Sequence, residues 1–494
     1  MVVGEVAVGA DLLVIGGGPG GYAAALRGAA AGRTVTLVER DRIGGVCLNV
    51  GCIPSKALIH VADTAALPAE SAAIGVDLTA SVDLDRAQAW IGDVVGRLTG
   101  GVDRLLRDAG VTVATGTARF ATARRVAVTR GDDATFYEFK SVILATGSRP
   151  VELPALPFDG QRVLDSTGAL ALRHVPGRLT VVGGGYIGVE LGGAWAKLGA
   201  DVTIVELADQ LLPGMPSGLA RTVERALRAR GVTIRLGTKV LGSDGDDLVV
   251  EGPAGEERLP IRRPALAPPA GRERRMGAIE ADGDGVVVVA VGRQPNTGSL
   301  GLAATGAPLD ADGRILVAPD RRAAADVYAI GDITPGPALA HKATAEAEVA
   351  VTAAGGRRAA FDPAAIPAVV YSDPQIATVG LTADRAAEAG ADPAAFRFPL
   401  AASGRALALA RPEGYVELVA DRGDGTVLGV HMVGAGVAEL AAEAALAVEM
   451  GATVEDLALT IAPHPTLSEA IAEAALGAAG RPLHVRRSRK EPRG

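Results

Sequence analysis

The chain contains two copies of one pattern, and this repeat constrains its fold more than any other feature. Each copy has a short apolar run, a glycine-rich turn, a helix and a second strand that ends at Glu. The separation from Gly16 to Glu39 equals that from Gly183 to Glu206, 23 positions. Equal spacing in two such units predicts an α/β fold with duplicated nucleotide-binding units. The expected strands are 11–15, 34–38, 179–182 and 201–205, with helices over 22–31 and up to 198.

Three glycines in each turn indicate a dinucleotide site. They are Gly16, Gly18 and Gly21 in the first copy, and Gly183, Gly185 and Gly188 in the second. The first glycine allows the tight turn, the second lets a pyrophosphate approach the helix N-terminus, and the third allows close packing of helix on strand. An ordinary turn between strand and helix is the alternative, because the chain has 65 glycines. The flanking strand and helix favour the dinucleotide interpretation in both copies.

The acidic residue that ends each unit indicates how a ribose is recognised. Glu39 and Glu206 stand where a carboxylate accepts hydrogen bonds from ribose hydroxyls. A 2′-phosphate would bring negative charge against Glu206, so the second site is expected to prefer NAD to NADP. The alternative is that both are exposed acids at strand ends.

The only two cysteines, Cys47 and Cys52, lie close together with four residues between them. Pro54 suits the first turn of a helix, which would put Cys52 at a helix N-terminus, where a thiolate is stabilised. A disulfide in a cytoplasmic protein is usually transient and catalytic, so we predict a redox pair. Two reduced core thiols remain an alternative. A zinc site is not expected, since no further Cys exists to complete the ligands.

Composition and charge restrict the class of protein. A length of 494 residues predicts three or four domains, and a net charge of -8 argues against a nucleic-acid partner. No run of eighteen uncharged apolar residues occurs, so we expect no membrane span and a cytoplasmic location. Residues 251–275, rich in Pro, Arg, Glu and Gly, are expected to form a solvated loop. Residues 480–494 are expected to form a disordered basic tail, with docking as the alternative.

Several motifs carry a resemblance to a known family. The run 44–56, GGVCLNVGCIPSK, is similar to the redox-active disulfide motif of dihydrolipoyl dehydrogenases, which are class I pyridine nucleotide-disulfide oxidoreductases. Further motifs follow in the family's order: ATG at 145–147, AVGR at 290–293, YAIGD at 328–332, LAHKA at 339–343 and HPTLSE at 464–469. The chain departs from the pattern at Ala462, where many members have His.

The resemblance implies an architecture. It implies an α/β fold with two Rossmann-like dinucleotide-binding domains, for FAD and NAD, and a C-terminal α+β dimerisation domain. The expected bounds are 1–150 for the FAD-binding domain with the redox disulfide, 151–282 for the NAD-binding domain, 283–355 for a central segment completing the FAD site, 356–478 for the dimerisation domain and 479–494 for the basic tail.

The resemblance also implies catalytic roles. Cys47 is expected to exchange with the substrate and Cys52 to contact the flavin. His464 is expected to act as the base, with Glu469 holding the far nitrogen of its ring. Lys56 would stabilise reduced flavin and Glu190 would be its ion-pair partner beside the nicotinamide. The remaining expected cofactor contacts are Asp332 at the ribityl chain, Ala340 at the adjoining helix start, Gly292 at the turn closing the NAD domain, and Ala118 and Val240 at the adenine rings.

The implied reaction passes electrons from a dihydrolipoyl dithiol through the Cys47–Cys52 disulfide and FAD to NAD. The implied partners are a second copy of the chain and lipoyl domains of 2-oxo acid dehydrogenase complexes or the glycine cleavage system. The alternative enzyme is another NAD(P)H-dependent flavoprotein disulfide reductase, similar to glutathione or mercuric reductases, although Glu206 opposes NADPH. A flavoprotein that serves only as a binding component is a further alternative, which the intact cysteines, His464 and Glu469 oppose.

Overall fold

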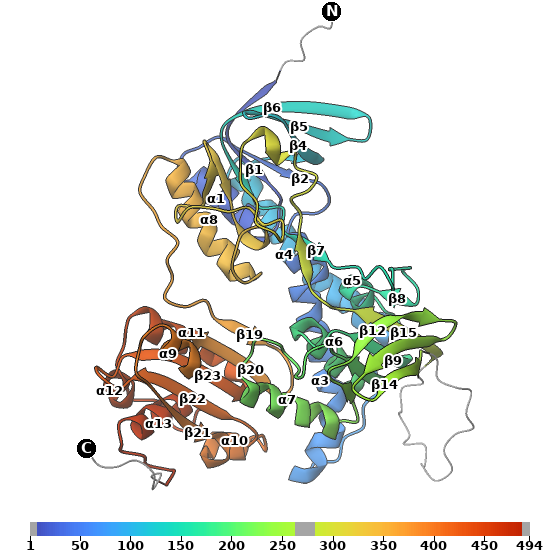
Figure 1. The fold of residues 1–494 in the computed structure, drawn as a ribbon, viewed down its shortest axis with the longest axis vertical. Helices are drawn as coiled ribbons and strands as arrows, with labels where there is room; N and C mark the ends of the chain where they lie inside the picture. Colours follow the sequence, from blue (N-terminus) through green and yellow to red (C-terminus); the bar gives the residue numbers. More distant parts are fainter. Residues whose placement is uncertain (1–6, 262–281, 487–494) are drawn as a thin grey trace, which may run out of the picture.

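The computed structural model describes residues 7–261 and 282–486 of the chain. In this part, three units are each built on a main sheet, and Figure 1 shows the first at the top, the second at the lower right and the third at the lower left. The first two units have sheets with parallel cores flanked by helices, and the third has an antiparallel sheet. The predicted class, two Rossmann-like units and a C-terminal α+β unit, is confirmed.

The first unit is built on an eight-stranded sheet whose parallel core has the order β18-β6-β1-β2-β3. Buried apolar residues of β1 pair with β2, with Leu12 opposite Val35. The strands are β1 (Val8–Ile15), β2 (Val35–Glu39), β3 (Thr112–Thr115), β4 (Thr117–Thr122), β5 (Arg125–Arg130), β6 (Asp133–Leu144), β17 (Arg322–Ala324) and β18 (Val327–Ala329). Helices α1 (Pro19–Ala30) and α8 (Ala340–Ala354) pack side by side on this unit, which therefore joins segments far apart in the sequence (Figure 1).

The strands around the glycine-rich turn of the second unit have the same order as the parallel strands around the turn of the first unit. Its five strands are all parallel and have the order β11-β10-β9-β15-β8. They are β8 (Val163–Leu164), β9 (Pro176–Val182), β10 (Asp201–Val205), β11 (Thr233–Arg235) and β15 (Asp282–Val289), with helices α5 (Ser166–Leu170), α6 (Tyr186–Lys197) and α7 (Ser217–Ala229). A small antiparallel sheet adjoins it, formed by β12 (Lys239–Asp244), β13 (Asp247–Gly252) and β14 (Gly255–Pro260).

Two antiparallel strands connect the first and second units. The chain leaves the first unit through β7 (Ser148–Pro150) and returns through β16 (Arg293–Pro295), and these strands pair with each other. The returning chain passes through the short helix η2 (Leu302–Ala304) to β17 and β18, and then through η3 (Gly331–Ile333) to α8. The second unit is therefore inserted between two parts of the first.

The third unit is a five-stranded antiparallel sheet in the order β19-β20-β23-β22-β21. The strands are β19 (Ala368–Val370), β20 (Gln375–Gly380), β21 (Pro393–Pro399), β22 (Tyr415–Asp421) and β23 (Val427–Gly434). Its helices are α9 (Ala383–Glu388), η4 (Leu400–Ala402), α10 (Gly404–Ala408), α11 (Val437–Glu449), α12 (Val454–Leu459) and α13 (Glu469–Ala478). Buried side chains such as Phe398 and Met432 form a core of its own beneath α11 and α13.

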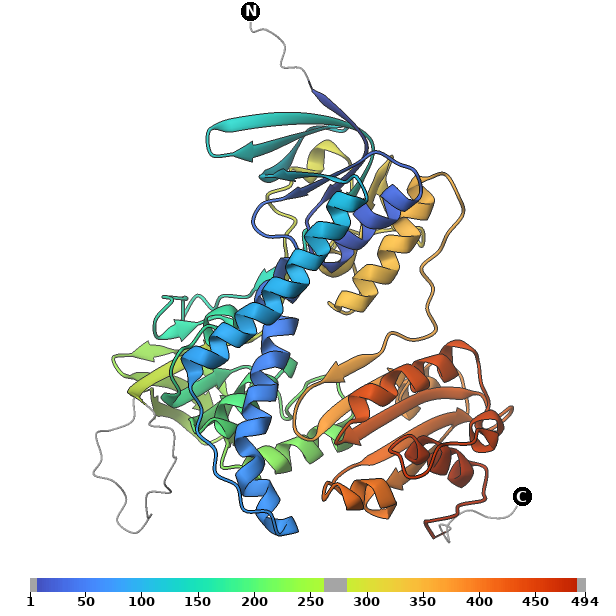
Figure 2. The same cartoon turned by 180° about the vertical axis from the view of Figure 1, so that it is seen from behind.

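Long helices extend from the first unit toward the other two, as Figure 2 shows most clearly. They are α3 (Cys52–Ser71) and α4 (Leu84–Asp108), and the short helices α2 (Gly45–Val50) and η1 (Ala72–Ile74) flank α3. The helical stretch Gly45–Ile74 is long and apolar enough to cross a membrane by length and composition alone. In the fold it packs on α4 and α6, and Asp63 and Glu70 form ion pairs with Lys197 and Arg230 of the second unit. These contacts make it a helix between two units.

Three expectations need correction. Residues 251–275 were expected to form a solvated loop, but 255–260 form β14, which pairs with β13; residues 262–275 lie outside the described residues. The expected boundary at 282/283 cuts β15, which belongs to the second sheet because it pairs with β9 and β8. The basic tail was expected to be disordered from 480, but 480–486 follow α13, where His484 bonds Glu473 at 2.7 Å and Val485 packs on the third core. Residues 487–494 lie outside the described residues.

Candidate active site

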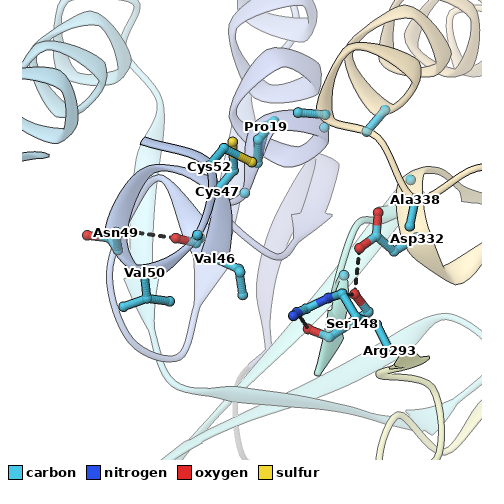
Figure 3. Close-up of a pocket in the computed structure, with 18 of the residues that line it drawn as sticks. Pro19, Val46, Cys47, Asn49, Val50, Cys52, Ser148, Arg293, Asp332 and Ala338 are labelled. Atoms are coloured by element: carbon cyan, nitrogen blue, oxygen red, sulfur yellow. Dashed lines mark hydrogen bonds between the residues drawn. The ribbon is translucent and has the colours of Figure 1, made fainter. Parts of the chain in front are cut away.

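A central cavity lies where the first turn, the cysteine helices and α6 meet (Figure 3). Of the predicted site residues, Gly16, Gly18, Glu39, Cys47, Cys52, Lys56, Glu190, Asp332 and Ala340 all line it. They come from segments far apart in the sequence, from Gly16 to Ala340, and the first two units both contribute. The cavity therefore brings together most of the predicted flavin and thiol contacts.

The two cysteines occupy consecutive helices that meet at Gly51. Cys47 lies in α2, and Cys52 is the first residue of α3, as the position of Pro54 predicts. Both are free thiols and Figure 3 shows their sulfur atoms next to each other. The hydrogen bond between the thiols lowers the pKa of Cys52 to about 7, against burial, which would raise it. The same hydrogen bond and burial raise the pKa of Cys47. Cys52 is therefore the thiol of the pair that ionises first.

An ion pair between Lys56 and Glu190 connects the first two units at the cavity. Lys56 lies one turn after Cys52 in α3, and its Nζ is 2.7 Å from Oε2 of Glu190 in α6. The Glu190 side chain is only 4% exposed, whereas that of Lys56 is 33% exposed. The ammonium helps to lower the pKa of Cys52, although the thiol hydrogen bond has the larger effect.

Asp332 is held on the opposite wall of the cavity from the cysteines (Figure 3). The Ser148 hydroxyl donates to Oδ2 of Asp332 at 2.5 Å, and Nε of Arg293 donates to Oγ of Ser148 at 2.8 Å. Ser148 and Arg293 belong to the paired strands β7 and β16. The paired strands β7 and β16 therefore also orient the Asp332 carboxylate, which is expected to bind the ribityl chain.

The glycines of each turn divide into two kinds. A Cβ on Gly21 would lie 1.7 Å from the carbonyl oxygen of Gly16, and one on Gly188 would lie 1.9 Å from that of Gly183. Packing of the protein on itself therefore requires these residues. A Cβ on Gly18 would meet nothing closer than 3.9 Å, and one on Gly185 nothing within 4 Å. The space above these middle glycines is available to a ligand at the start of α1 and of α6.

The two acidic strand ends make the same hydrogen bonds in both units. Oε2 of Glu39 accepts from the N–H of Gly17 at 2.6 Å, and Oε2 of Glu206 accepts from the N–H of Gly184 at 2.6 Å. Oε1 of Glu206 also accepts from the N–H of Ala208 at 2.7 Å. The carboxylates therefore fix the glycine-rich turns, a contact that the sequence did not predict.

The predicted adenine and turn contacts lie in different surroundings. Ala118 lines a hollow with Gly16 and Glu39, next to the central cavity. Val240 lies on β12, two residues after Thr238, whose N–H bonds the carbonyl of Glu206. Gly292 precedes β16 with a positive φ of 129°. Ala118 thus shares a hollow with the acidic residue of its unit, whereas Val240 follows Thr238, the residue that bonds Glu206.

The predicted acid-base pair lies in the third unit. Nδ1 of His464 is 2.8 Å from Oε1 of Glu469, the first residue of α13, and the N–H of Thr466 bonds Oε2 at 2.7 Å. Burial alone would raise the pKa of Glu469, but Thr466 and His464 hold it below its usual value. The His464 side chain is 79% exposed. Neither His464 nor Glu469 is among the described residues that line the central cavity.

Sequence reasoning missed several cavity residues and contacts. They are Ser148 beside Asp332, Asn296 and Tyr186 in the cavity wall, and Tyr371, whose N–H bonds Glu190. Tyr186 directly follows Gly185, the second glycine of its turn, so its place at the helix start could have been noticed. Nothing local in the sequence indicates the other three. Among residues 7–261 and 282–486, no group of three or more His, Cys, Asp or Glu side chains is arranged to hold a metal ion.

Family models match two parts of the chain. Residues 10–347 match the pyridine nucleotide-disulphide oxidoreductase model, and residues 366–475 match the dimerisation domain of the same family. The chain belongs to the pyridine nucleotide-disulphide oxidoreductase family. Membership agrees with the thiol pair and the two glycine-rich turns, and the dimerisation domain supports a homodimer.

Curated relatives in this oxidoreductase family match nearly the whole chain. Dihydrolipoyl dehydrogenases from Geobacillus stearothermophilus and Halobacterium salinarum are each 44% identical, covering 98% of this chain and 99% of the relative. The dihydrolipoyl dehydrogenase from Bacillus subtilis is 42% identical over 98% of this chain and 100% of its own length. The resemblance stated from the motifs is confirmed.

Solved structures of the oxidoreductase family share the fold. LpdA from Mycobacterium tuberculosis superposes with a TM-score of 0.83 at 27% identity, covering 94% of this chain and 99% of that one. The HOCl-induced flavoprotein disulfide reductase RclA from Escherichia coli, solved as a Cu(II) complex, gives a TM-score of 0.79 at 26% identity over 94% of this chain and 98% of that one.

Proposed function

We propose that this chain oxidises protein-bound dihydrolipoyl groups to lipoyl groups and passes the electrons through Cys47, Cys52 and FAD to NAD. The observation that carries this proposal is the pair of adjacent thiols in a cavity that also holds Glu39 and Asp332. Full-length relatives named dihydrolipoyl dehydrogenase support this substrate over glutathione disulfide or mercuric ion.

The residues of the first unit fit FAD. The start of α1 above Gly18 has room for a pyrophosphate, and the hollow at Ala118 adjoins Glu39, as an adenosine requires. Asp332 and Ala340 both line the cavity, and we infer that Asp332 binds the ribityl chain. When bound there, FAD would supply the electron transfer from the dithiol and the hydride transfer to the nicotinamide.

The residues of the second unit fit NAD. The start of α6 above Gly185 is open to a pyrophosphate. Val240 lies on β12 and Gly292 directly precedes β16, and Glu190 of α6 lines the central cavity, where we expect the nicotinamide to meet the flavin. The buried carboxylate of Glu206 favours the ribose hydroxyls of NAD, because a 2′-phosphate would add negative charge beside it.

The thiols and the acid-base pair supply the disulfide exchange. One substrate thiolate attacks Cys47 of the oxidised pair, which breaks the Cys47–Cys52 bond and releases Cys52 as a thiolate. The second substrate thiol then loses its proton to His464 and attacks the substrate sulfur bonded to Cys47. This step closes the lipoyl disulfide and releases the Cys47 sulfur, so the substrate loses two electrons and the cysteines gain them. Glu469 stabilises the protonated ring of His464.

The base that serves each thiol pair comes from the second copy. His464 is exposed on the third unit and does not line the cavity of its own chain. We therefore infer that the partner subunit's His464 faces Cys47 in the homodimer. The proposed partners beyond the dimer are lipoyl domains of 2-oxo acid dehydrogenase complexes or of the glycine cleavage system, in the cytoplasm.

Substrate assays test the proposed function. We expect the purified protein to hold flavin, to reduce NAD with dihydrolipoamide, and to show little turnover with glutathione disulfide and NADPH. Cys47→Ser should keep the flavin and abolish dihydrolipoamide turnover, because the attacked sulfur is absent. Strong NADPH-dependent glutathione reduction without lipoamide turnover would overturn the proposal, and unchanged turnover in Cys47→Ser would remove Cys47 from the mechanism.

A further inference from the structure

The carboxylate of Glu190 joins all three units of the chain. Its Oε2 accepts from Nζ of Lys56 in the first unit at 2.7 Å, and its Oε1 accepts from the N–H of Tyr371 in the third unit at 2.9 Å. Glu190 itself lies in α6 of the second unit and is only 4% exposed. Both carboxylate oxygens are therefore occupied, and each contact crosses a boundary between units.

The ring of Tyr371 makes a second contact with the same lysine. Nζ of Lys56 lies over this ring, 4.7 Å from its centroid. This distance is within the range of about 6 Å over which a ring face attracts an ammonium group. Tyr371 directly follows β19, and its side chain is half-buried. The ammonium thus contacts a carboxylate of the second unit and an aromatic face of the third.

Two contacts restrict Lys56 more than one would. The lysine side chain has a flexible four-carbon stem, and its compact ammonium can satisfy one carboxylate in many orientations. A ring face offers attraction from a direction that the carboxylate does not, so the ammonium is held between them. Because Lys56 lines the central cavity one turn after Cys52, its position determines the positive charge beside the reactive thiol.

We propose that Tyr371 is a positioning residue of the redox site, whose ring fixes the Lys56 ammonium beside Cys52 and the flavin. The effect on the flavin rests on the proposed function, whereas the effect of Lys56 on the Cys52 thiol does not depend on that function. The third unit, which carries the dimerisation domain, would in this way adjust the electrostatics of the cavity in its own chain.

The chemistry at Cys52 gives this position a measurable effect. Lys56 lowers the pKa of the Cys52 thiol and Glu190 raises it, both after the larger contributions of the Cys47 hydrogen bond and burial. A lysine released from the ring would spend more time away from the thiol, while the buried carboxylate would stay. The titratable and charged groups that line the cavity are Glu39, Arg40, Asp41, Arg42, Cys47, Cys52, Lys56, Tyr186, Glu190, Arg293 and Asp332.

Tyr371→Leu and Tyr371→Phe separate the ring from the rest of the residue. Both variants keep the backbone N–H that bonds Glu190, and Leu keeps bulk without a ring face, whereas Phe keeps the face and loses only the hydroxyl. The first readout is the pH dependence of Cys52 alkylation by iodoacetamide in a Cys47→Ser background, where Cys52 is the only cysteine. The second is the midpoint potential of the bound flavin.

We expect Tyr371→Leu to slow alkylation near neutral pH about threefold and to make the flavin harder to reduce. Tyr371→Phe should keep the alkylation rate within about a factor of two and leave the midpoint potential unchanged. Tyr415→Leu is the matched control, because the ring of Tyr415 packs under Arg397 at 4.7 Å in the same unit and does not line the central cavity. That control should leave both readouts unchanged.

A fluorinated phenylalanine series keeps the test decisive even if Tyr371→Leu fails to fold. Mono-, di- and trifluorophenylalanine at 371 weaken the ring face stepwise with little change of shape, so both readouts should shift in step with fluorine number. Equal values across the series, or equal shifts in the Phe and Leu variants, would overturn the inference. Neither readout uses lipoamide turnover, so failure of the proposed substrate leaves the alkylation result able to support or refute the role of Tyr371.

Discussion

Replacing Cys47 with Ala should raise the pKa of the Cys52 thiol, because the hydrogen bond from Cys47 is the largest cause of its low value of about 7. A hydrogen bond to a charged group contributes about 1.5–3 kcal/mol, and one pKa unit corresponds to about 1.4 kcal/mol. The pKa should therefore rise by about 1–2 units. At pH 7 the thiolate fraction would fall from about one half to between about a tenth and a hundredth.

Cys47→Ser is the matched control for this change, because serine keeps a hydroxyl that can donate to the Cys52 sulfur. The chain has only two cysteines, so each variant has a single thiol, and the rate of iodoacetamide alkylation against pH reports Cys52 alone. The midpoint is the quantity to compare, since intrinsic nucleophilicity changes with pKa and alters the absolute rate. Coincident midpoints for the Ala and Ser variants would refute the assignment of the low pKa to the Cys47 hydrogen bond.

Three further predictions concern other parts of the chain. Gly185→Ala should fold normally and hold flavin but raise the KM for NAD at least about tenfold. Gly188→Ala should instead lower the melting temperature, because its Cβ would lie 1.9 Å from the Gly183 oxygen. Equal stability of the two variants would contradict this prediction. Glu206→Gln should raise the NADP-to-NAD ratio of kcat/KM about tenfold, or about 1.4 kcal/mol, because it removes the charge that opposes a 2′-phosphate; an unchanged ratio in steady-state assays would contradict this. Burial would raise the pKa of Asp373, but the cations of Lys197, Arg411 and Arg230 hold this pKa below 3.8. The carboxylate therefore stabilises the fold above about pH 4, and this stabilisation is lost as the pH falls through the pKa of Asp373 in the folded protein. Asp373→Asn should therefore cost about 2 kcal/mol at pH 7 and progressively less in denaturant titrations below about pH 4; a deficit independent of pH would speak against the ion pairs.

The duplicated units and the thiol pair were predictable from sequence because their signals are local. The glycine turns, the equal spacing to Glu39 and Glu206, and Pro54 after Cys52 each act within one turn or one unit. The burial of the last four residues of β1 follows from the continuous apolar run 12–15, as expected for a parallel strand covered on both faces. Resemblance to the family then supplied the roles of distant residues such as His464.

The remaining contacts were not predictable because they are formed between residues far apart in the chain. Ser148 and Asp332 are separated by 184 positions, and Tyr371 and Glu190 by 181, with no periodic pattern to relate them. The β13–β14 hairpin was missed for a different reason. Its second strand, 255–260, has mostly exposed polar side chains, so its pairing with β13 depends on backbone hydrogen bonds, which leave little trace in hydrophobic patterning.

The paired strands β7 and β16 have a consequence for how such a protein can change over evolutionary time. Because β7 and β16 pair with each other, the segment between Pro150 and Arg293 begins and ends at the same place in the fold, as an inserted domain does. Genetic exchange at these two strands would replace the second unit, and its nucleotide preference, without changing the path of the rest of the chain. Any replacement must leave Ser148 and Arg293 side by side, so that the carboxylate of Asp332 keeps its support, and must supply a carboxylate in the place of Glu190 to pair with Lys56.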